Sequence, residues 1–311
     1  MLLLNHLYTR SPPFNNPEIS INSGQVFLWE KFDNSWYGIY GDHVLKFSTS
    51  APNDDGTKDN GIEFFSFPDF KGWEERIFRL DDNIQKILSG FSNDSLISEA
   101  IKRYPGLRLM RQEPHQCMFS FVCSSNTNIP MIRRMLRNLC RKYGTKLVVD
   151  GKEFFTFPRV DSLNRASVSE LLSCGVGYRA KAIKAVAHSI ADGNIDANDL
   201  MRASYDDAKE ELLKIYGIGN KIADCILLFS LEKLEAFPID IWIAKAISLH
   251  YSWLLFGNEK EGKKWKQIHQ KMTSTQYKTF SETIRGYFGK YSGYAQQYLF
   301  YHMRQSEYKR W

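Results

Sequence analysis

The first hundred residues contain short apolar stretches separated by turn signals. Stretches of this length, rich in aromatic and β-branched residues, are typical of β-strands. Gly-Asp and Asp-Asn pairs favour tight turns between them, and a polar, glycine-containing loop interrupts the pattern at 50–61. We therefore predict a small antiparallel sheet with accompanying helices: strands at 25–29, 36–40, 44–47 and 62–67, and helices at 81–88 and 94–104.

Beyond residue 105 the pattern changes to one typical of helices. Helices are predicted at 130–143, which is strongly basic, and at 167–174 and 180–190. Asp150-Gly151 favours the turn of a β-hairpin spanning 148–154. The chain is thus predicted to have an α+β fold, in which an antiparallel β subdomain with helices (1–105) precedes a helical domain (106–311).

A helix, a glycine hairpin and a second helix are predicted within 207–230. Gly217-Ile218-Gly219 ends the first helix, because two glycines tolerate φ values that a β-carbon does not. Asn220 is expected to cap the second helix, where apolar residues recur at helical spacing. The bare backbone N–H groups at a helix start attract phosphate, so the hairpin is a candidate binding site for a nucleic-acid backbone.

Lys221 lies in the first turn of this second helix, and Asp240 is placed to cap another helix 19 residues later. The separation leaves room for one helix and a return loop, so the two side chains can face each other. Burial and the positive end of a helix dipole favour the neutral, nucleophilic amine, and an ionised Asp240 can stabilise a developing cation. An isolated lysine or aspartate is usually a surface residue or an ordinary cap. The adjacent hairpin instead favours attack of the amine at a sugar carbon of DNA.

Composition limits the cellular environment and the kinds of partner to be expected, but it does not identify the function. The chain has 311 residues, and its 41 basic and 35 acidic side chains give a net charge of +6, which is compatible with nucleic-acid binding but does not establish it. The five cysteines are scattered and form no C-x-x-C pair, so a zinc or iron–sulfur site is not expected. Their odd number and wide spacing favour free thiols in a reducing environment. No apolar run approaches the length of a membrane span. We expect an intracellular monomer located with the genome.

Four parts of the chain carry distinctive motifs: SGQVFLW (23–29), GLRLMRQEPHQCMFSFVCSSNTNI (106–129), GVGYRAKA (175–182), and IYGIGNKIADCILL (215–228) with FPIDIW (237–242). Together they resemble the 8-oxoguanine DNA glycosylases of the helix–hairpin–helix (HhH-GPD) superfamily, in the family's order. The resemblance implies a β subdomain followed by the helical glycosylase fold. It also implies a bifunctional glycosylase and lyase whose partner is duplex DNA containing 8-oxoguanine, with the damaged nucleotide flipped into a pocket.

The resemblance assigns roles around the flipped base. Lys221 matches the catalytic lysine, which forms a Schiff base, and Asp240 matches the catalytic carboxylate. Gly24 matches the glycine whose carbonyl accepts the N7–H that 8-oxoguanine has and guanine lacks; an unmatched buried partner costs about 1–3 kcal/mol. A cysteine and a phenylalanine sandwich the base, and a glutamine reads its Watson–Crick edge: Cys225, Phe300 and Gln296.

Other matches concern the opened duplex. Asn126 matches the asparagine that fills the vacated stack, Tyr178 the wedge that bends the duplex, and Arg179 a reader of the orphaned cytosine. Gly217 and Gly219 match the hairpin glycines that contact the DNA backbone. A monovalent or divalent structural cation is implied at the backbone carbonyls of Leu213, Ile215 and Ile218, and no catalytic cofactor is required.

Two positions depart from the family pattern. Met131 stands where well-known members carry a second arginine directed at the estranged cytosine, so discrimination of the opposite base is expected to be relaxed. Trp242 stands where those members have a histidine two residues after the aspartate, which removes a phosphate partner and makes the local geometry beyond Asp240 uncertain.

Two other kinds of protein fit parts of this pattern. One is a glycosylase of the same scaffold that acts on other damaged bases. Endonuclease-III-like members carry a four-cysteine cluster, whereas no cysteine follows Cys225, and alkyl-base glycosylases typically lack the lysine found at 221. The other is a non-catalytic DNA-binding protein that uses only the hairpin. Such a module needs neither Lys221 nor Asp240, so the pair favours an enzyme.

Overall fold

The computed structural model describes residues 16–49, 62–256 and 272–308. Four strands form an antiparallel meander in which each pairs with the next along the chain. Trp36 lies opposite Phe47, and the two rings stack with their centroids 6.4 Å apart. The strands are β1 (Trp29–Phe32), β2 (Ser35–Tyr40), β3 (His43–Thr49) and β4 (Ile62–Phe67). The expected loop at 50–61 lies outside the described residues.

One face of this sheet buries aromatic rings against helix α2 (Trp73–Ile77). The ring of Trp73 lies 6.1 Å from that of Trp29 and 5.4 Å from that of Phe64. Gly38 lies directly opposite Trp29, and a β-carbon at Gly38 would come within 2.3 Å of the indole. Only glycine at this position lets the tryptophan lie across the neighbouring strand. The sheet thus has an aromatic core of its own.

The strand expected at 25–29 is displaced toward the C-terminus, because the chain is helical up to Gln25 and β1 begins only at Trp29. The helical segments are α1 (Pro17–Ser20) and the π-helical turn η1 (Ile21–Gln25). The buried amide of Gln25 donates to the Arg108 carbonyl at 2.8 Å and accepts from the Met110 N–H at 2.7 Å. These bonds hold the segment against a distant part of the chain instead of against a strand.

The rest of the described chain is mainly helical, and the helices expected at 94–104, 130–143 and 180–190 are confirmed. The elements are α3 (Ile84–Ser89), α4 (Ser95–Arg103), α5 (Pro114–Cys123), α6 (Ile129–Tyr143), β5 (Lys146–Val149), β6 (Lys152–Phe155), α7 (Val160–Arg165), α8 (Val168–Leu172), η2 (Gly177–Arg179), α9 (Ala180–Ala191), α10 (Ala197–Arg202), α11 (Tyr205–Leu213), α12 (Asn220–Ser230), α13 (Ile241–His250), α14 (Ser252–Phe256), α15 (Ser274–Phe288), η5 (Gly289–Tyr291) and α16 (Ser292–Tyr308). None of the helices in the described ranges combines the length and the apolar character that crossing a bilayer requires.

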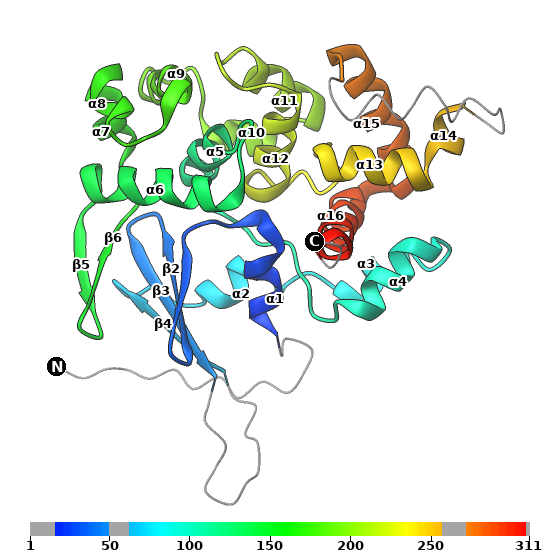
Figure 1. Ribbon diagram of the computed structural model, residues 1–311, viewed down its shortest axis with the longest axis horizontal. Helices are drawn as coiled ribbons and strands as arrows, with labels where there is room; N and C mark the ends of the chain where they lie inside the picture. The colour runs from blue at the N-terminus through cyan, green and yellow to red at the C-terminus, as the bar shows by residue number, and fades with distance from the viewer. Residues whose placement is uncertain (1–15, 50–61, 257–271, 309–311) are drawn as a thin grey trace, which may run out of the picture.

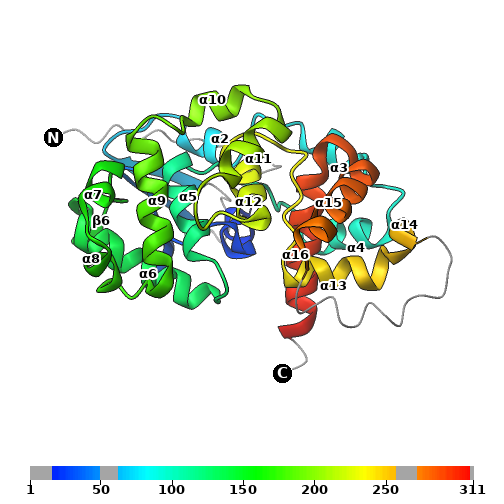
Figure 2. The same ribbon diagram turned by 90° about the horizontal axis from the view of Figure 1, so that it is seen from above.

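Helix α12 lies between two groups of helices. Figure 1 shows the sheet beneath α5 and α6, and Figure 2 shows α6–α9 on one side and α13–α16 on the other, with α12 between them. Every residue of α12 from 222 to 230 is buried, and the helix packs against α5, α11 and α15. The rings of Phe27 and Phe121 meet at 5.7 Å in a core shared by both parts of the chain. Because this core contains residues from both sides of residue 105, it does not separate two domains there, and the predicted boundary stays a prediction.

The β5–β6 hairpin confirms the expected Asp-Gly turn. Asp150 and Gly151 both have positive φ, 50° and 71°, as a two-residue turn of this kind requires. The Asp150 carboxylate also accepts hydrogen bonds from the Tyr37 hydroxyl and the Lys46 amine, each at 2.7 Å. The turn is therefore attached to the N-terminal sheet.

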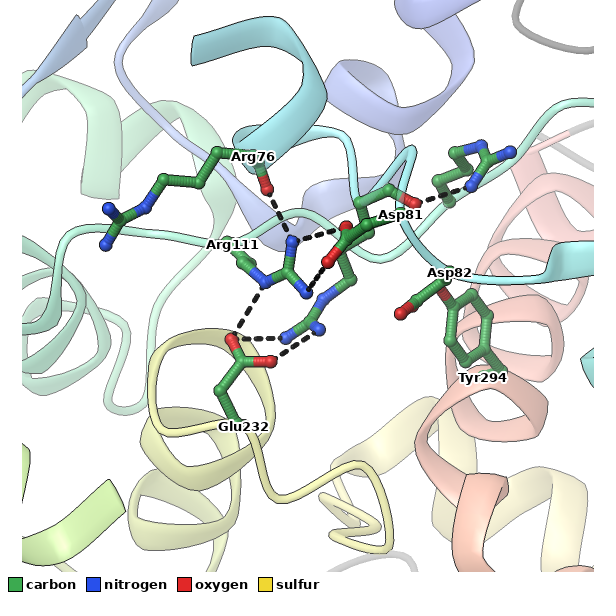
Figure 3. Close-up of polar contacts among 8 residues, drawn as sticks. Arg76, Asp81, Asp82, Arg111, Glu232 and Tyr294 are labelled. Carbon is green, nitrogen blue, oxygen red and sulfur yellow. Dashed lines mark hydrogen bonds and ion pairs between the residues drawn. The ribbon is translucent and has the colours of Figure 1, made fainter. Parts of the chain in front are cut away.

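A network of ion pairs joins the N-terminal part of the chain to the end of α12 (Figure 3). Arg79, whose side chain is fully buried, donates two hydrogen bonds to the Glu232 carboxylate, at 2.8 and 3.0 Å. Arg111 donates to the same carboxylate at 3.0 Å and to that of Asp81 at 2.6 and 2.8 Å. Because Glu232 follows α12 closely, these bonds fix the C-terminal end of that helix.

The arginines also set the charge of the two acids. Burial by itself raises the pKa of Glu232, but Arg79 and Arg111 outweigh it and lower the pKa below its usual 4.5. Hydrogen bonds from Arg111 likewise lower the pKa of Asp81. At pH values above their ordinary pKa values, both carboxylates therefore make their full contribution to the stability of the fold. That contribution is lost as the pH falls through the lowered values.

We expect Glu232→Gln to lower the melting temperature at pH 7 by about 5 °C, because hydrogen bonds to charged groups contribute roughly 1.5–3 kcal/mol. The difference from the wild type should shrink as the pH falls below about 4.5 and through the lowered pKa of Glu232, where the native carboxylate also becomes neutral. Thermal unfolding from pH 3 to pH 8 measures both effects. Glu211→Gln, which removes an exposed pair with Lys214, serves as the control and should change little. A difference independent of pH would contradict this account.

Candidate functional site

Lys221 is the second residue of α12, and its amine lies beside the segment that follows α5. The amine donates to the Ser124 hydroxyl at 3.2 Å and lies 5.3 Å from the centre of the Phe121 ring. The expected Asn220 cap is wrong: Gly219 occupies the N-cap, and Asn220 is the first helical residue. Having no side chain, Gly219 offers no oxygen to the first N–H groups of α12. Those groups remain suited to bind an anion.

Asp240 caps α13 as expected. Its Oδ1 accepts hydrogen bonds from the N–H groups of Trp242 at 3.0 Å and Ile243 at 2.9 Å. Burial of the carboxyl raises the pKa of Asp240, while the N–H donors and the charge of Lys221 oppose that rise. The structure therefore brings Lys221 and Asp240 close enough to interact through charge, as the sequence analysis expected.

Cys225 lies one helical turn after Lys221 and is buried. Burial raises the pKa of its thiol to about 12, and both Lys221 and Asp240 act on it electrostatically. At neutral pH the thiol is protonated, so it is an apolar neighbour of the pair and not a competing nucleophile.

Helix α16 carries Gln296 and Phe300, and Gln296 contacts the segment that precedes Asp240. The Gln296 amide nitrogen donates to the Pro238 carbonyl at 3.1 Å, two residues before Asp240. Its amide oxygen is buried and has no hydrogen-bond partner among the described residues. A buried acceptor of this kind is suited to a ligand that brings its own donor.

Gly24 lies beside Phe300 and needs to be glycine. Its φ of +89° falls in the left-handed region, and a β-carbon there would come within 2.9 Å of the Phe300 ring and 2.8 Å of the Arg304 guanidinium. The neighbouring Ser23 carbonyl accepts a hydrogen bond from Gln297 at 3.1 Å. The N-terminal turn is therefore attached to the same helix that carries Gln296 and Phe300.

Asn126, Tyr178 and Arg179 form a second cluster, next to the first. Asn126 is exposed and has a positive φ of 50°, and the Tyr178 side chain is 63% exposed. The Tyr178 hydroxyl donates to the Ser125 carbonyl at 3.1 Å. Ser125 follows the serine that contacts Lys221, so the two clusters adjoin through the backbone of 124–126.

Arg179 was expected to contact the orphaned cytosine, but its side chain points into the protein. Its guanidinium is buried under the Tyr178 ring and donates to the carbonyl groups of Ser125, Asn126 and Val176. The expected contact with an orphaned cytosine would require these bonds to break. In this conformation Arg179 instead supports the backbone that presents Asn126, and the contact with DNA stays a prediction.

The two hairpin glycines differ in their surroundings. Gly217 has φ +90°, and a β-carbon there would lie 2.2 Å from the β-carbon of Ala182 in α9. Gly219 has φ −99° and no neighbouring atom within 4 Å of the corresponding position. Gly217 is therefore required by packing, whereas Gly219 leaves the start of α12 open.

The cation implied at the hairpin carbonyls stays a prediction. Ile215 and Ile218 are buried, Leu213 is exposed, and the Ile215 carbonyl already accepts the Ile218 N–H at 3.1 Å. Backbone oxygens have a second lone pair, so this bond does not exclude a cation. Among the residues that the structure describes, no group of three or more His, Cys, Asp or Glu side chains is arranged to hold a metal.

Ser124 and Phe121 were not singled out by the sequence analysis, although both contact the Lys221 amine. A serine at the end of a helix and a phenylalanine within one are too common to indicate a site. Met131 is 40% exposed in the first turn of α6, and Trp242 is partly buried. The Trp242 N–H contacts the Asp240 carboxylate directly, and Met131 follows Asn126 by five residues.

Two family models match the chain, one described as the N-terminal domain of 8-oxoguanine DNA glycosylase (14–118) and one as the HhH-GPD superfamily of base excision DNA repair proteins (119–272). A probable N-glycosylase/DNA lyase of Methanothermobacter thermautotrophicus is 31% identical over 252 residues, which cover 75% of this chain and 74% of the relative. An N-glycosylase/DNA lyase of Arabidopsis thaliana is 29% identical over 296 residues, covering 91% and 75%.

Solved structures give the same result. The apo form of the 8-oxoguanine glycosylase/lyase of Clostridium acetobutylicum superposes with a TM-score of 0.76 at 30% identity, covering 91% of each chain. Its complex with double-stranded DNA containing cytosine opposite 8-oxoguanine gives 0.78 at 29% identity, covering 93% of this chain and 91% of that one. A 3-methyladenine DNA glycosylase of Archaeoglobus fulgidus, at 17% identity and 0.63, shares the fold alone.

We expect Gly217→Ala to destabilise the protein by about 3 kcal/mol, since overpacking and a left-handed backbone both penalise a β-carbon. Gly219→Ala is the matched control and should change the free energy of unfolding by no more than about 0.5 kcal/mol. Thermal and denaturant unfolding of both variants measure the difference. Equal stability of the two variants would contradict the packing role of Gly217.

Proposed function

The chain belongs to the 8-oxoguanine DNA glycosylases, and from this membership we propose that it excises 8-oxoguanine from duplex DNA through the amine of Lys221. Its relatives are named N-glycosylase/DNA lyases, so it is a bifunctional DNA repair enzyme. The positions of the two side chains support the residue assignment: Lys221 lies in the first turn of α12, and the buried Asp240 caps α13, where the charge of Lys221 opposes the rise in pKa that burial causes.

The proposed chemistry uses both side chains in the step that releases the base. The Lys221 amine, in its deprotonated form, forms a bond to C1′ of the damaged nucleotide, while the bond from C1′ to the base nitrogen breaks and the base leaves with the bonding electrons and takes up the proton that the amine loses. The Asp240 carboxylate stabilises the positive charge that develops on the sugar. The sugar ring then opens as the C1′–O4′ bond breaks, the ring oxygen takes up the second amine proton, and the lysine nitrogen and C1′ form a Schiff base. Loss of a proton from C2′ then expels the 3′ phosphate and cuts the strand.

Recognition of the base is assigned to the residues that α16 and η1 bring to the pair. We propose that the Gly24 carbonyl accepts the N7–H of 8-oxoguanine, and that the base lies between Cys225 and Phe300. Gln296 reads the Watson–Crick edge, and its unpaired, buried amide oxygen supports this role. A buried polar site rejects a base that lacks the matching group, because a partner is then left unsatisfied.

The duplex is proposed to contact the hairpin and the second cluster. Phosphate binds the open N–H groups at the start of α12, beside Gly217 and Gly219. Asn126 enters the space left by the flipped nucleotide and Tyr178 wedges the neighbouring base step, a proposal supported by the exposure of both side chains. A cation at the hairpin carbonyls and a monomeric state belong to the same proposal. A repair enzyme of genomic DNA acts inside the cell.

Lys221→Gln should abolish excision of 8-oxoguanine and the borohydride-trapped cross-link to a lesion-bearing duplex, because the substitution removes the attacking amine. Lys214→Gln, an exposed lysine of the same hairpin, is the matched control and should retain both. Asp240→Asn should slow base release by about 100-fold or more, as expected for loss of charge stabilisation, with duplex binding largely unchanged. Cross-linking by Lys221→Gln, or failure of the wild type to cross-link, would contradict the mechanism. Equal loss of binding and rate in Asp240→Asn would indicate a structural role.

The opposite base should be discriminated weakly, because Met131 supplies no donor to cytosine and Arg179 is engaged by the protein backbone. We expect single-turnover excision of 8-oxoguanine opposite C, A, G and T to differ by less than about tenfold, since a good bidentate base contact discriminates by about 1–3 kcal/mol. Met131→Arg should restore a preference for cytosine, with Met131→Leu as the control. A strong cytosine preference in the wild type would be inconsistent with this explanation.

A further inference from the structure

Asp224 is a fully buried carboxylate in α12, the helix that carries Lys221. It accepts hydrogen bonds from the hydroxyl groups of Tyr205 and Tyr277, each at 2.6 Å. The Lys209 amine lies 2.9 and 3.0 Å from its two oxygens. A buried charge is tolerated only when it is paired and hydrogen-bonded in this way.

One of these tyrosines, Tyr277, contacts the loop that immediately precedes Asp240. The Tyr277 hydroxyl also accepts a hydrogen bond from the Ile239 N–H at 3.0 Å, and Ile239 immediately precedes Asp240. Burial and the charge of Asp224 raise the pKa of Tyr277 well above its ordinary value, so the phenol keeps its proton. A hydroxyl has one hydrogen to donate. Because that hydrogen is directed to Asp224, an oxygen lone pair remains for the Ile239 N–H.

The loop before Asp240 is therefore held from two sides. Gln296 of α16 donates to the Pro238 carbonyl at 3.1 Å, and Tyr277 of α15 accepts from the next residue, Ile239. Asp224 is three residues after Lys221 in the same helix. The chain of bonds from Asp224 through Tyr277 to Ile239 thus joins the helix of the amine to the backbone that carries the carboxylate.

We propose that Tyr277, oriented by Asp224, is a positioning residue that holds the Asp240 carboxylate in place relative to the Lys221 amine. This inference rests on the proposed function, in which these two groups act on the sugar. A misplacement of about 1 Å in an active site lowers the rate by roughly 100-fold. The loss of one hydroxyl should thus slow the chemistry while leaving the DNA-contacting surface intact.

Tyr277→Phe tests this, because it removes the hydroxyl and keeps the ring. Single-turnover excision of 8-oxoguanine is expected to fall by about 10- to 100-fold. The Kd for a duplex carrying an uncleavable lesion analogue should change less than about twofold, because the contacts proposed for DNA lie on other elements. Tyr205→Phe is the matched control: it removes an equally short bond to the same carboxylate but has no link to Ile239, so it should keep the wild-type rate.

A double variant separates positioning from general destabilisation. If Tyr277 acts through the carboxylate, Tyr277→Phe should cause little further loss in an Asp240→Asn background. Asp224→Asn is carried as a second variant should Tyr277→Phe fail to fold, and it should give the same separation of rate from Kd.

Three results would overturn the inference: a wild-type rate in Tyr277→Phe, equal losses in Tyr277→Phe and Tyr205→Phe, or a parallel loss of rate and Kd. A wild type unable to excise 8-oxoguanine would instead refute the proposed function itself, which keeps the two failures distinct.

Discussion

The burial of α12 is the constraint on which the site depends. From 222 to 230 this helix has no exposed residue, and it packs against α5, α11 and α15. A helix enclosed on every side cannot rotate without breaking close packing, so the direction in which Lys221 leaves it is fixed. The backbone of α12 does not have to move for the Lys221 amine to contact its neighbours. Lys221, the residue proposed to react, lies at the partly exposed start of the helix.

Polar contacts fix α12 along its whole length. At its start the Lys221 amine meets Ser124, in its middle Asp224 is paired with Lys209 and two tyrosines, and beyond its end Glu232 is held by two arginines. Each contact reaches a different part of the chain. Burying charged groups is costly unless they are paired, so the two arginines and Lys209 are what allow Glu232 and Asp224 to occupy these positions.

The candidate base site combines close packing with polar groups. Gly24 lacks a side chain where Phe300 lies close, and Cys225 stays a neutral thiol beside a charged pair. The buried amide oxygen of Gln296 has no partner among the described residues, although most buried polar groups in proteins do. An acceptor held in this state favours a ligand that supplies a donor. Guanine offers the same donors on its Watson–Crick edge, so the preference for the oxidised base is proposed to come from the Gly24 carbonyl, which would accept the N7–H that guanine lacks.

Local chemistry was enough to predict several features from the sequence alone. The Asp150-Gly151 turn, the Asp240 cap and the left-handed Gly217 of the hairpin depend on residues close in sequence, and their backbone preferences act before any tertiary contact forms. The spacing of Lys221 and Asp240 already predicted that the two side chains can face each other, and the resemblance to a known family then assigned them catalytic roles.

Tertiary structure alone decided the features that depend on distant partners. Gln25 takes part in a helical turn and not a strand because its amide is satisfied by residues near 110, and Arg179 turns inward because carbonyl groups of 125 and 126 accept its hydrogens. The contact of Ser124 with Lys221, and the path from Asp224 through Tyr277 to Ile239, join residues tens of positions apart. Hydrogen bonds between such residues leave no periodicity in the sequence, so only the folded arrangement determines them.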